Sequence, residues 1–580
     1  MKKPLAPREK LVLALGMLLV VALPLSVDIG CAGPFRTPKS LLAAVLWAAL
    51  AWLFLARPSF DAWCWPAAAV VGAGLVASLL VAPLGVLQLP PVILASLGFF
   101  ALRQLPPQGK TLLAKAVVWG GVGQALLALA FYDPASRPAS WALLEQGEGR
   151  YLFLGTMGNP ADVAVYLVLP TLLAASFALA GKRRLLWAAA ALLQASVIVA
   201  TQTLSALAAL GVGLVLLVGK RLPAAKRLPA AAGLALALLL VVFAVPPLRQ
   251  RLAVAWQEAS RYGFAWVASA RGAAWLAAWK MFLAKPLLGF GFGQFEAHSF
   301  SFLPQEVLAE RGKVLGLETG FGEAHNELLQ FLAETGLLGL LALTAALVFA
   351  WRRARKAAPL LPAAPLLAAA VVLASLQFPL HLAATAAQWL AVAALLLPPL
   401  PLGKPRSWGF AAGALLLAAA SVLAWGQWRA WRAVQAAEVL VTGLRAQGAG
   451  EAKKVVAAQA YQGLEAKLAL LAWDYRARTV AGNLAREAGA FQEAVDHFRA
   501  AVALAERPET RFNLGVTLLS LGQEQEGLQH LVRAVELNPA VLRVVEEPLL
   551  AAKLHAALVQ RGYFARFPWA EPWLSPKKAP

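Results

Sequence analysis

The chain has 580 residues, of which 60% are hydrophobic and only 14% are charged, and its mean hydropathy is +0.66. Soluble proteins carry about 25% charged residues, so this composition excludes an ordinary soluble protein and indicates a membrane protein. Its 52 Lys and Arg exceed its 30 Asp and Glu, which gives a formal net charge of +22. The basic residues stand in short clusters between apolar runs, without interleaved aromatic residues, which argues against a nucleic-acid partner.

Apolar runs long enough to cross a membrane follow one another through most of the chain. A hydrocarbon core of ~30 Å requires about 20 mostly apolar helical residues, and about thirteen such runs precede residue 432. The predicted spans are residues 11–28, 40–56, 65–83, 86–105, 112–132, 161–180, 185–201, 204–219, 229–247, 327–350, 360–379, 383–402 and 407–428. No small-residue cleavage site follows the first span, so we expect it to be a retained helix rather than a signal peptide.

The basic clusters predict the orientation of these spans. If the N-terminus, with Lys2 and Lys3, is cytoplasmic, the clusters after the sixth, eighth and tenth spans are cytoplasmic too, as expected for the cytoplasmic membrane. Those clusters are Lys182–Arg184, Lys220 with Arg221, and Arg352 with Arg353. An odd number of spans then places the C-terminal part of the chain outside the cytoplasm.

Three outward segments are long enough to carry a function. They are residues 133–160, the connection 248–326, and the tail from residue 432. The connection is rich in aromatic residues, and Trp275, Trp279 and Phe282 have the helical spacing i, i+4, i+7. We therefore expect an amphipathic helix at the outer membrane surface.

In the tail, residues 432–580, charged residues return and apolar positions take helical periodicity, which predicts a second domain after a membrane domain of residues 1–431. A pattern recurs with an offset of 33 residues: Gly482, Gly489, Ala494, Phe498 and Ala501 correspond to Gly515, Gly522, Gly527, Leu531 and Ala534. This pattern resembles the tetratricopeptide repeat, a helix pair of ~34 residues with small residues where helices meet. The sequence thus predicts an all-α protein, a membrane helical bundle followed by an extracytoplasmic α-solenoid with capping helices at 451–471 and 541–561; a generic array of helical hairpins is the alternative.

Two stretches on the outward side hold candidate chemistry. Arg271 begins the first, and His325 lies in the second, directly before the span that starts at residue 327. A histidine accepts a proton near neutral pH, so His325 is a candidate general base. An arginine binds phosphate through two parallel hydrogen bonds, so Arg271 is a candidate phosphate ligand. Taken singly, each has a structural alternative: a helix-capping histidine, and an arginine that reaches lipid headgroups.

Three alternating glycines, Gly289, Gly291 and Gly293, lie between the two stretches. Backbone without side chains is suited to close approach by a bulky or phosphorylated ligand. No strand precedes them, and the outward face lacks ATP and NADH, so we do not expect a nucleotide site.

These stretches resemble the O-antigen ligase and O-antigen polymerase superfamily. The resemblance rests on R-x(3)-W-x(2)-A from Arg271, P-L-x-G-x-G from Pro286, and A-H-N-x-x-L-x-x-x-x-E-x-G-x-x-G from Ala324 to Gly339. Gly155–Pro160, with the sequence G-T-M-G-N-P, is similar to the family segment that opens the sixth span.

The resemblance implies a GT-C-like polytopic glycosyltransferase on the outer face of the cytoplasmic membrane. Its donor would be a glycan on undecaprenyl pyrophosphate, and its acceptor a hydroxyl of lipid A-core, another glycan or a protein. In the family, the arginine at the position of Arg271 binds the pyrophosphate, and the histidine at the position of His325 activates the acceptor. The resemblance implies no cofactor and no metal, and no D-x-D motif precedes the tail.

The chain departs from the family at one position. Many members carry a second arginine in a T-x-S-R-G segment, and here Leu204 stands at that place, after Thr201-Gln202-Thr203. Either phosphate neutralisation then comes from elsewhere, with Arg150, Arg249 and Arg261 as candidates, or the chemistry differs from that of the family. Arg150 also has a plain alternative as a loop arginine.

Four polar residues near His325 are weaker candidates. Glu323 and Asn326 either orient the histidine or cap the following helix. Glu334, about two turns inside the tenth span, is either functional or a hydrogen-bonded structural group. His381, in an outward turn, approaches the same site or lies at the membrane interface.

The ligase-like transferase is the leading hypothesis. The same superfamily offers a polysaccharide polymerase or a protein O-oligosaccharyltransferase, with the tail holding an acceptor or a protein partner. Two hypotheses of other classes are a bicarbonate or solute transporter and a non-catalytic assembly scaffold. A transporter places ionisable groups near the midplane, whereas these spans are nearly free of charge.

Overall fold

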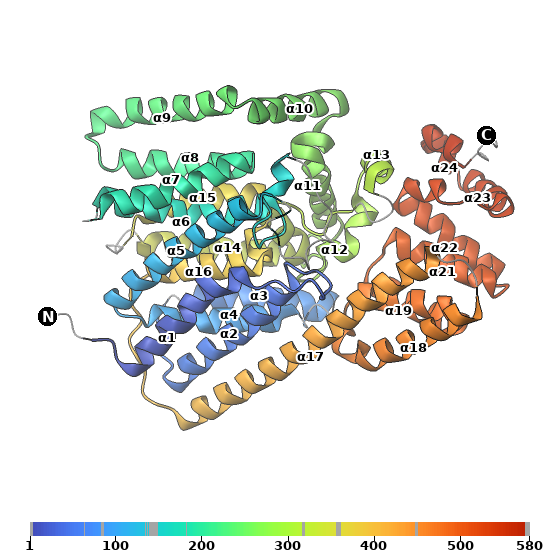
Figure 1. The fold of residues 1–580 in the computed structure, drawn as a ribbon, viewed down its shortest axis with the longest axis horizontal. Coiled ribbons are helices and arrows are strands. Elements are labelled where there is room, and N and C mark those ends of the chain that lie inside the picture. The colour runs from blue at the N-terminus through green and yellow to red at the C-terminus, as the bar shows by residue number, and fades with distance from the viewer. Residues whose placement is uncertain are drawn as a thin grey trace.

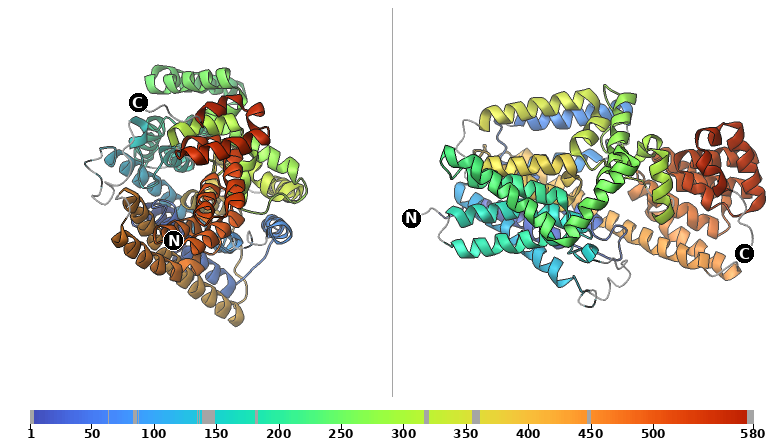
Figure 2. Two further views of the ribbon diagram at one scale, coloured as in Figure 1. Left: turned by 90° about the vertical axis from the view of Figure 1, so that its right-hand side faces the viewer. Right: turned by 90° about the horizontal axis from the view of Figure 1, so that it is seen from above.

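The computed structural model describes residues 4–62, 64–82, 86, 88–133, 135, 137, 149–180, 183–315, 320–354, 361–446 and 450–574. These residues form helices and turns and no strand, as predicted. A bundle of long helices makes up one part of the molecule, and a tail of shorter helices projects from the end opposite to the N-terminus (Figures 1 and 2).

Each predicted span overlaps one helix of the bundle. The bundle helices are α1 (Pro7–Met17), α2 (Thr37–Ala56), α3 (Cys64–Val81), α4 (Leu89–Arg103), α5 (Pro107–Ala130), α6 (Pro160–Ala180), α7 (Arg184–Ala200), α8 (Leu204–Gly219), α9 (Ala224–Ala244), α14 (Glu327–Ala354), α15 (Ala363–Leu376), α16 (Ala383–Leu396) and α17 (Ser407–Ala446). Within the described residues, six helices are long and apolar enough to cross a membrane, and five more are apolar but shorter. The number of spans stays a prediction.

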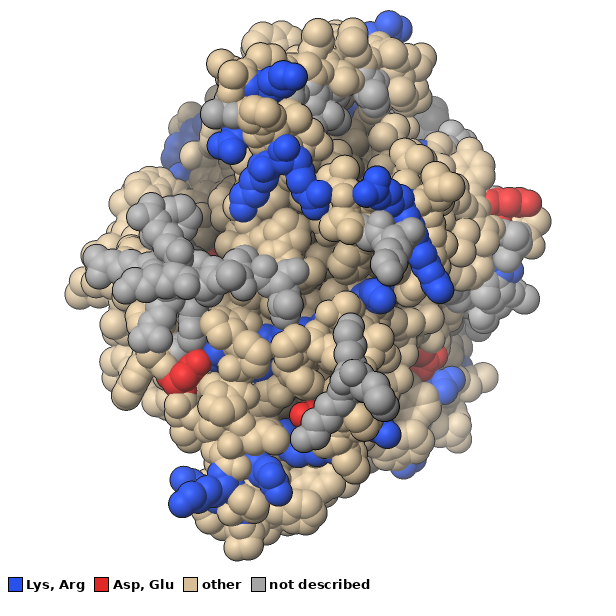
Figure 3. Space-filling model, turned by 90° about the vertical axis from the view of Figure 1, so that its left-hand side faces the viewer, with Lys and Arg blue, Asp and Glu red and all other residues tan. Residues whose placement is uncertain are grey.

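The bundle end nearest the N-terminus is basic. The end of α6, the start of α7 and the α8–α9 connection lie at this end (Figure 1), and the face it presents shows many Lys and Arg but few Asp and Glu (Figure 3). In the predicted orientation this end faces the cytoplasm, and that orientation stays a prediction.

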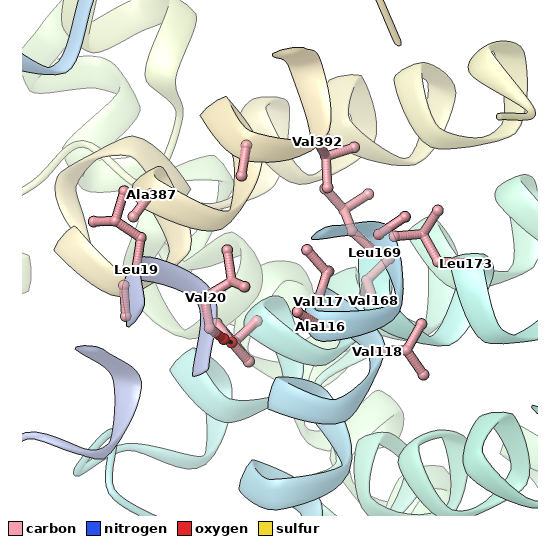
Figure 4. Close-up of a cluster of buried hydrophobic side chains, with 14 of the residues drawn as sticks. Leu19, Val20, Ala116, Val117, Val118, Val168, Leu169, Leu173, Ala387 and Val392 are labelled. Atoms are coloured by element: carbon pink, nitrogen blue, oxygen red, sulfur yellow. Dashed lines mark hydrogen bonds between the residues drawn. The ribbon is translucent and has the colours of Figure 1, made fainter. Parts of the chain in front are cut away.

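Small residues let helices approach closely in the bundle core. Figure 4 shows part of this core, where Val20, Val117 and Leu169 are buried. The hydroxyl of Tyr166 donates a 2.8 Å hydrogen bond to the carbonyl oxygen of Val20. A Cβ at Gly120 would lie 2.2 Å from that carbonyl oxygen, so this contact requires glycine on α5.

The predicted connection contains four helices, α10 (Pro246–Tyr262), α11 (Val267–Ala284), α12 (Phe295–His298) and α13 (Gln305–Leu315). α11 covers the predicted amphipathic segment. It turns a fully buried alanine face inward, whereas Trp279 is 45% exposed. The buried alanines are Ala273, Ala274, Ala277 and Ala278. Its position at a membrane surface stays a prediction.

The tail consists of α18 (Glu451–Leu468), α19 (Tyr475–Glu487), α20 (Phe491–Leu504), α21 (Pro508–Ser520), α22 (Glu524–Leu537), α23 (Pro548–Gln560) and α24 (Tyr563–Arg566). α17 runs unbroken through residue 431 into the tail. A Cβ at Gly482 would lie 2.7 Å from the Phe498 ring, and one at Gly515 would lie 2.7 Å from Leu531 Cγ. The small residues therefore stand where helices meet in both units; the assignment to the tetratricopeptide family stays a prediction.

Candidate active site

α11 carries the predicted arginine and contacts the segment of the predicted histidine. Arg271 and Trp275 are one helical turn apart and so share a face of α11. The indole Nε1 of Trp275 donates a 3.4 Å hydrogen bond to the carbonyl oxygen of His325, 50 residues further along the chain. This contact holds the His325 segment against the helix that carries Arg271.

The end of α15 holds the Arg271 guanidinium. Nη1 donates to the carbonyl oxygen of Leu376 at 3.2 Å. With the Gln377 amide turned to satisfy its neighbours, its oxygen accepts from Nη1 and Nη2 of Arg271 at 3.1 and 3.2 Å and from Ser205 Oγ at 2.6 Å. Burial first, and then the charge of Arg251, lower the pKa of Arg271 to about 10. A bound anion would relieve this unfavourable environment of the cation.

The turn between α15 and α16, residues 376–381, connects the parts of the site. The Phe378 ring centroid is 4.7 Å from that of His325. The Arg36 guanidinium carbon lies 5.4 Å from the same Phe378 centroid. The backbone N–H of Leu380 donates a 2.6 Å hydrogen bond to Glu327 Oε1, at the start of α14. One turn thus contacts the histidine, the helix after it and a second arginine.

His381, at the end of this turn, belongs to the same network. Its Nδ1 lies 3.1 Å from Glu327 Oε2, and its Nε2 lies 2.9 Å from the Gln330 amide nitrogen. Burial lowers the pKa of His381, but the hydrogen bond with Glu327 and the charges of Glu327, Glu334 and Glu323 outweigh it and raise the pKa to about 9. The Glu327 carboxylate at Nδ1 thus favours the charged form of His381, whereas the Gln330 amide nitrogen at Nε2 is a donor and favours the neutral form.

The two residues that flank His325 have separate partners. Glu323 Oε1 lies 2.8 Å from Arg36 Nη1, and Arg36 Nη2 lies 3.7 Å from Asp162 Oδ2. Asn326 Oδ1 accepts a 3.0 Å hydrogen bond from the N–H of Leu329, so Asn326 caps α14, one of its two predicted roles. Within the described part of the chain, no three His, Cys, Asp or Glu side chains group closely enough to hold a metal ion.

The backbone is strained in three of the segments that the sequence singled out. Among the described residues, the non-glycine residues with positive φ are Gln202 at 53°, Ala270 at 65° and His325 at 54°. Gln202 precedes Leu204, and Ala270 precedes Arg271. Such conformations cost about 1–2 kcal/mol for an L-residue and concentrate at functional sites.

The segment Gly155–Pro160 anchors α6 beside this network. The Thr156 hydroxyl is buried and donates to the Pro24 carbonyl oxygen at 2.7 Å, and Lys39 Nζ donates to the Thr156 carbonyl oxygen at 2.7 Å. The segment thereby fixes the start of α6 and places Asp162 beside Arg36. A small pocket opens here, lined by residues of α2, α6 and the turn before α16, including Arg36, Asp162 and His381.

The three predicted glycines pack against the chain itself. Each has positive φ, and a Cβ would lie 2.4 Å from the Glu334 carbonyl carbon at Gly289, 2.7 Å from Ala82 at Gly291 and 1.7 Å from Gln88 at Gly293. Glu334 accepts hydrogen bonds from the backbone N–H groups of Gly293 at 2.8 Å and Phe295 at 3.2 Å. Contacts within the chain thus account for the glycines without a ligand. Glu334 is hydrogen-bonded, as the structural one of its two predicted roles requires.

Positive charge reaches Arg271 from two directions. Burial first, followed by the charges of Arg251 and Arg271, lowers the pKa of Arg150 to about 10. In the described structure, the buried Nε and Nη1 of Arg150 have no hydrogen-bond partner. Leu204 is half-buried at the start of α8, next to Ser205, which contacts Gln377. Arg251, rather than the predicted Arg249 or Arg261, exerts the largest effect of any charge on both Arg150 and Arg271.

Sequence reasoning missed Arg36, Arg251, Gln377 and Phe378. One signal was available for Arg36, because it precedes the second span on the predicted outward side, against the prevailing charge distribution. Gln377 and Phe378 end an apolar run with a polar residue and a following proline, which marks a turn but no chemistry. Nothing local distinguishes Arg251 from Arg249.

Comparison with known proteins adds one identification. Residues 189–344 match the family described as O-antigen ligase, which supports membership of that superfamily. The matched residues run from α7 into α14 and include Leu204, Arg271, the three glycines and His325. A search of curated proteins gave no significant match. A search of solved structures gave none either.

Proposed function

We propose that this chain, an integral membrane protein with an O-antigen ligase domain over residues 189–344, transfers a glycan from undecaprenyl pyrophosphate to an acceptor hydroxyl. The reaction would take place on the outer face of the cytoplasmic membrane. The observation that carries the proposal is the hydrogen bond from Trp275 to the His325 carbonyl oxygen, because it joins the candidate base to the helix of the candidate phosphate ligand.

The arginines of the site would neutralise the negative charge of the departing pyrophosphate. Burial and the charge of Arg251 lower the pKa of Arg271 and of Arg150, and an anion bound between these side chains would offset both effects. Arginine binds phosphate oxygens with charge-assisted hydrogen bonds. The cluster therefore compensates for the arginine that is absent at Leu204.

The transfer step needs a base and charge stabilisation. The acceptor oxygen attacks the anomeric carbon of the donor glycan while His325 takes the acceptor proton, and the bond from that carbon to the pyrophosphate oxygen breaks. The electron pair of the broken bond leaves with undecaprenyl pyrophosphate, whose added charge the arginines stabilise. The donor phosphate ester supplies the driving force, so no nucleotide is consumed.

Polymerisation and protein glycosylation use the same step with a different acceptor. In either case the tail, which projects from the bundle end that carries the site, is placed to hold an acceptor or a protein partner (Figure 1). Stacked helix pairs present surfaces suited to such binding.

Transfer by the purified protein tests the proposal. Protein in nanodiscs is mixed with a lipid-linked glycan pool and envelope acceptors, and the mass of any product separates ligation from polymerisation. We expect product with the wild type and none with His325→Ala. The control is His555→Ala, which makes the same change at a half-exposed tail histidine that contacts Glu571.

Absence of product from the wild type, with a donor pool that a known transferase uses, would refute the proposal. The scaffold and transport hypotheses would then take its place.

A further inference from the structure

The tail contacts a short segment, Glu296–Phe300. This segment packs against the loop of residues 320–326, called the His325 loop below. Glu296, in α12, accepts a 2.6 Å hydrogen bond from Arg476 and a 3.0 Å hydrogen bond from the Tyr475 hydroxyl. Arg507 lies 3.7 Å from the same carboxylate oxygen. All three partners belong to the tail, and Tyr475 and Arg507 stand at or directly before the first residues of α19 and α21.

Arg507 is buried at this contact. Its side chain is 7% exposed, its guanidinium carbon lies 4.5 Å from the Phe300 ring centroid, and its Nε bonds Glu509 at 2.9 Å. Phe300 itself is fully buried. A buried arginine between an aromatic ring and two carboxylates is a fixed structural contact rather than a surface ion pair.

Backbone contacts join the same two parts. The N–H of Glu506 donates a 3.1 Å hydrogen bond to the carbonyl oxygen of Ala297. The Glu506 carboxylate accepts a 3.1 Å hydrogen bond from Ser301 and is held by Arg511 and Arg533. The arginines hold the pKa of Glu506 at about 2, even though burial opposes them. The Glu506 carboxylate therefore stays negatively charged near neutral pH, and its ion pairs with Arg511 and Arg533 persist there.

The opposite side of Glu296–Phe300 contacts the His325 loop. A Cβ at Gly320 would lie 2.3 Å from the Phe300 ring, so the loop backbone lies flat on that ring. Ser299 Oγ donates a 3.3 Å hydrogen bond to the Phe321 carbonyl oxygen. The Phe321 ring in turn stands edge-to-face to His325, with centroids 6.2 Å apart. A chain of contacts therefore runs from Arg507 through Phe300 and Phe321 to the histidine.

We propose that the tail contributes to the active site by positioning the His325 loop. It does so by holding Glu296–Phe300 in place, and Arg507 is the positioning residue. The proposal rests on the proposed function for its effect on catalysis. In this proposal the tail acts on the active site of its own chain, in addition to any acceptor or partner that it binds.

The test combines kinetics with hydrogen exchange on the full-length protein. For Arg507→Met we expect kcat to fall at least ten-fold, with less than a two-fold change in donor KM, and amide exchange to rise in residues 320–326. Arg507→Lys keeps the charge and should recover part of kcat. The control is Arg499→Gln, which removes a solvent-exposed partner of Glu526 in the same tail and should match the wild type.

A second variant covers unfolding of the tail. Glu296→Gln lies outside the tail and removes the charge from the other side of the contact, so it should raise exchange in residues 320–326 while the tail helices keep wild-type exchange. Wild-type exchange in those residues in both variants, or loosening confined to the tail, would overturn the proposal. If the wild type transfers no glycan, the proposed function fails, and the exchange data still decide whether the tail positions the loop.

Discussion

Arg251→Gln tests whether this arginine replaces the charge that is absent at Leu204. The matched control is Arg249→Gln, because Arg249 lies two residues earlier on α10 and is exposed, whereas Arg251 is half-buried. Both variants remove one positive charge from the same helix. Only the Arg251 variant removes a charge that reaches Arg271 and Arg150.

The expected loss is an order-of-magnitude estimate from Coulomb's law for a representative separation. A unit charge about 6 Å from a phosphate oxygen contributes about 3 kcal/mol at an effective dielectric constant of about 20. Half-exposure and salt reduce this to about 1.5 kcal/mol, which corresponds to about ten-fold in binding. We therefore expect kcat/KM for the lipid-linked donor to fall about ten-fold in Arg251→Gln and less than two-fold in Arg249→Gln.

Two measurements check this expectation in nanodiscs of neutral lipid. The first is the transfer rate as a function of donor concentration. The second is the rise in melting temperature on adding inorganic pyrophosphate, which needs no turnover and should be smaller in Arg251→Gln than in the wild type. Equal effects of the two variants would refute the reasoning, since the loss would then reflect net charge rather than a site.

Three further predictions concern single contacts. Trp275→Phe keeps a ring but removes the hydrogen bond to the His325 carbonyl oxygen. This bond is worth about 1 kcal/mol, so kcat should fall about five-fold. An unchanged kcat would show that the contact does not affect catalysis. Glu334→Gln leaves one acceptor oxygen for the N–H groups of Gly293 and Phe295, so the free energy of unfolding in detergent should fall by about 2–3 kcal/mol, and an unchanged unfolding midpoint would contradict this. His381→Gln removes a group whose folded pKa of about 9 exceeds its ordinary value, so its stabilisation is complete below about pH 6.5 and lost towards about pH 9. The difference in melting temperature between wild type and His381→Gln should follow that curve, and a difference independent of pH would count against it.

The helices, and the face of α11 that carries Arg271, were predictable because they depend on local patterns. Apolar runs mark the bundle helices, and the tail repeat is visible as a fixed offset of 33 residues. Arg271 and Trp275 share a helix face by their spacing alone. What the spacing could not show is that Trp275 bonds the His325 backbone, because that contact joins two elements 50 residues apart.

The rest of the site depends on contacts across the bundle. Arg36 and Glu323 are 287 residues apart, so no sequence window contains both. The turn that holds Phe378 enters the site only because α15 and α16 pack beside α14 and α6. The glycines show the opposite difficulty: positive φ and close approach were foreseeable, but the sequence does not say whether the approaching group is a ligand or the chain.

The strain in the site bears on the scaffold hypothesis. A protein that only assembles others has no use for Gln202, Ala270 and His325 in conformations that cost about 1–2 kcal/mol each, since relaxing these turns would stabilise the fold. Each of these residues lies in a motif segment or directly before one. Among the described residues, the conformational cost therefore falls where a transferase needs fixed geometry. Leu204 does not weaken this argument, because a pyrophosphate responds to charge at a point in space and not to the helix that delivers it. Under the proposed function, Arg150 and Arg251 deliver that charge from other segments. The charge of Arg251 lowers the pKa of Arg271, and the charges of Arg251 and Arg271 lower the pKa of Arg150.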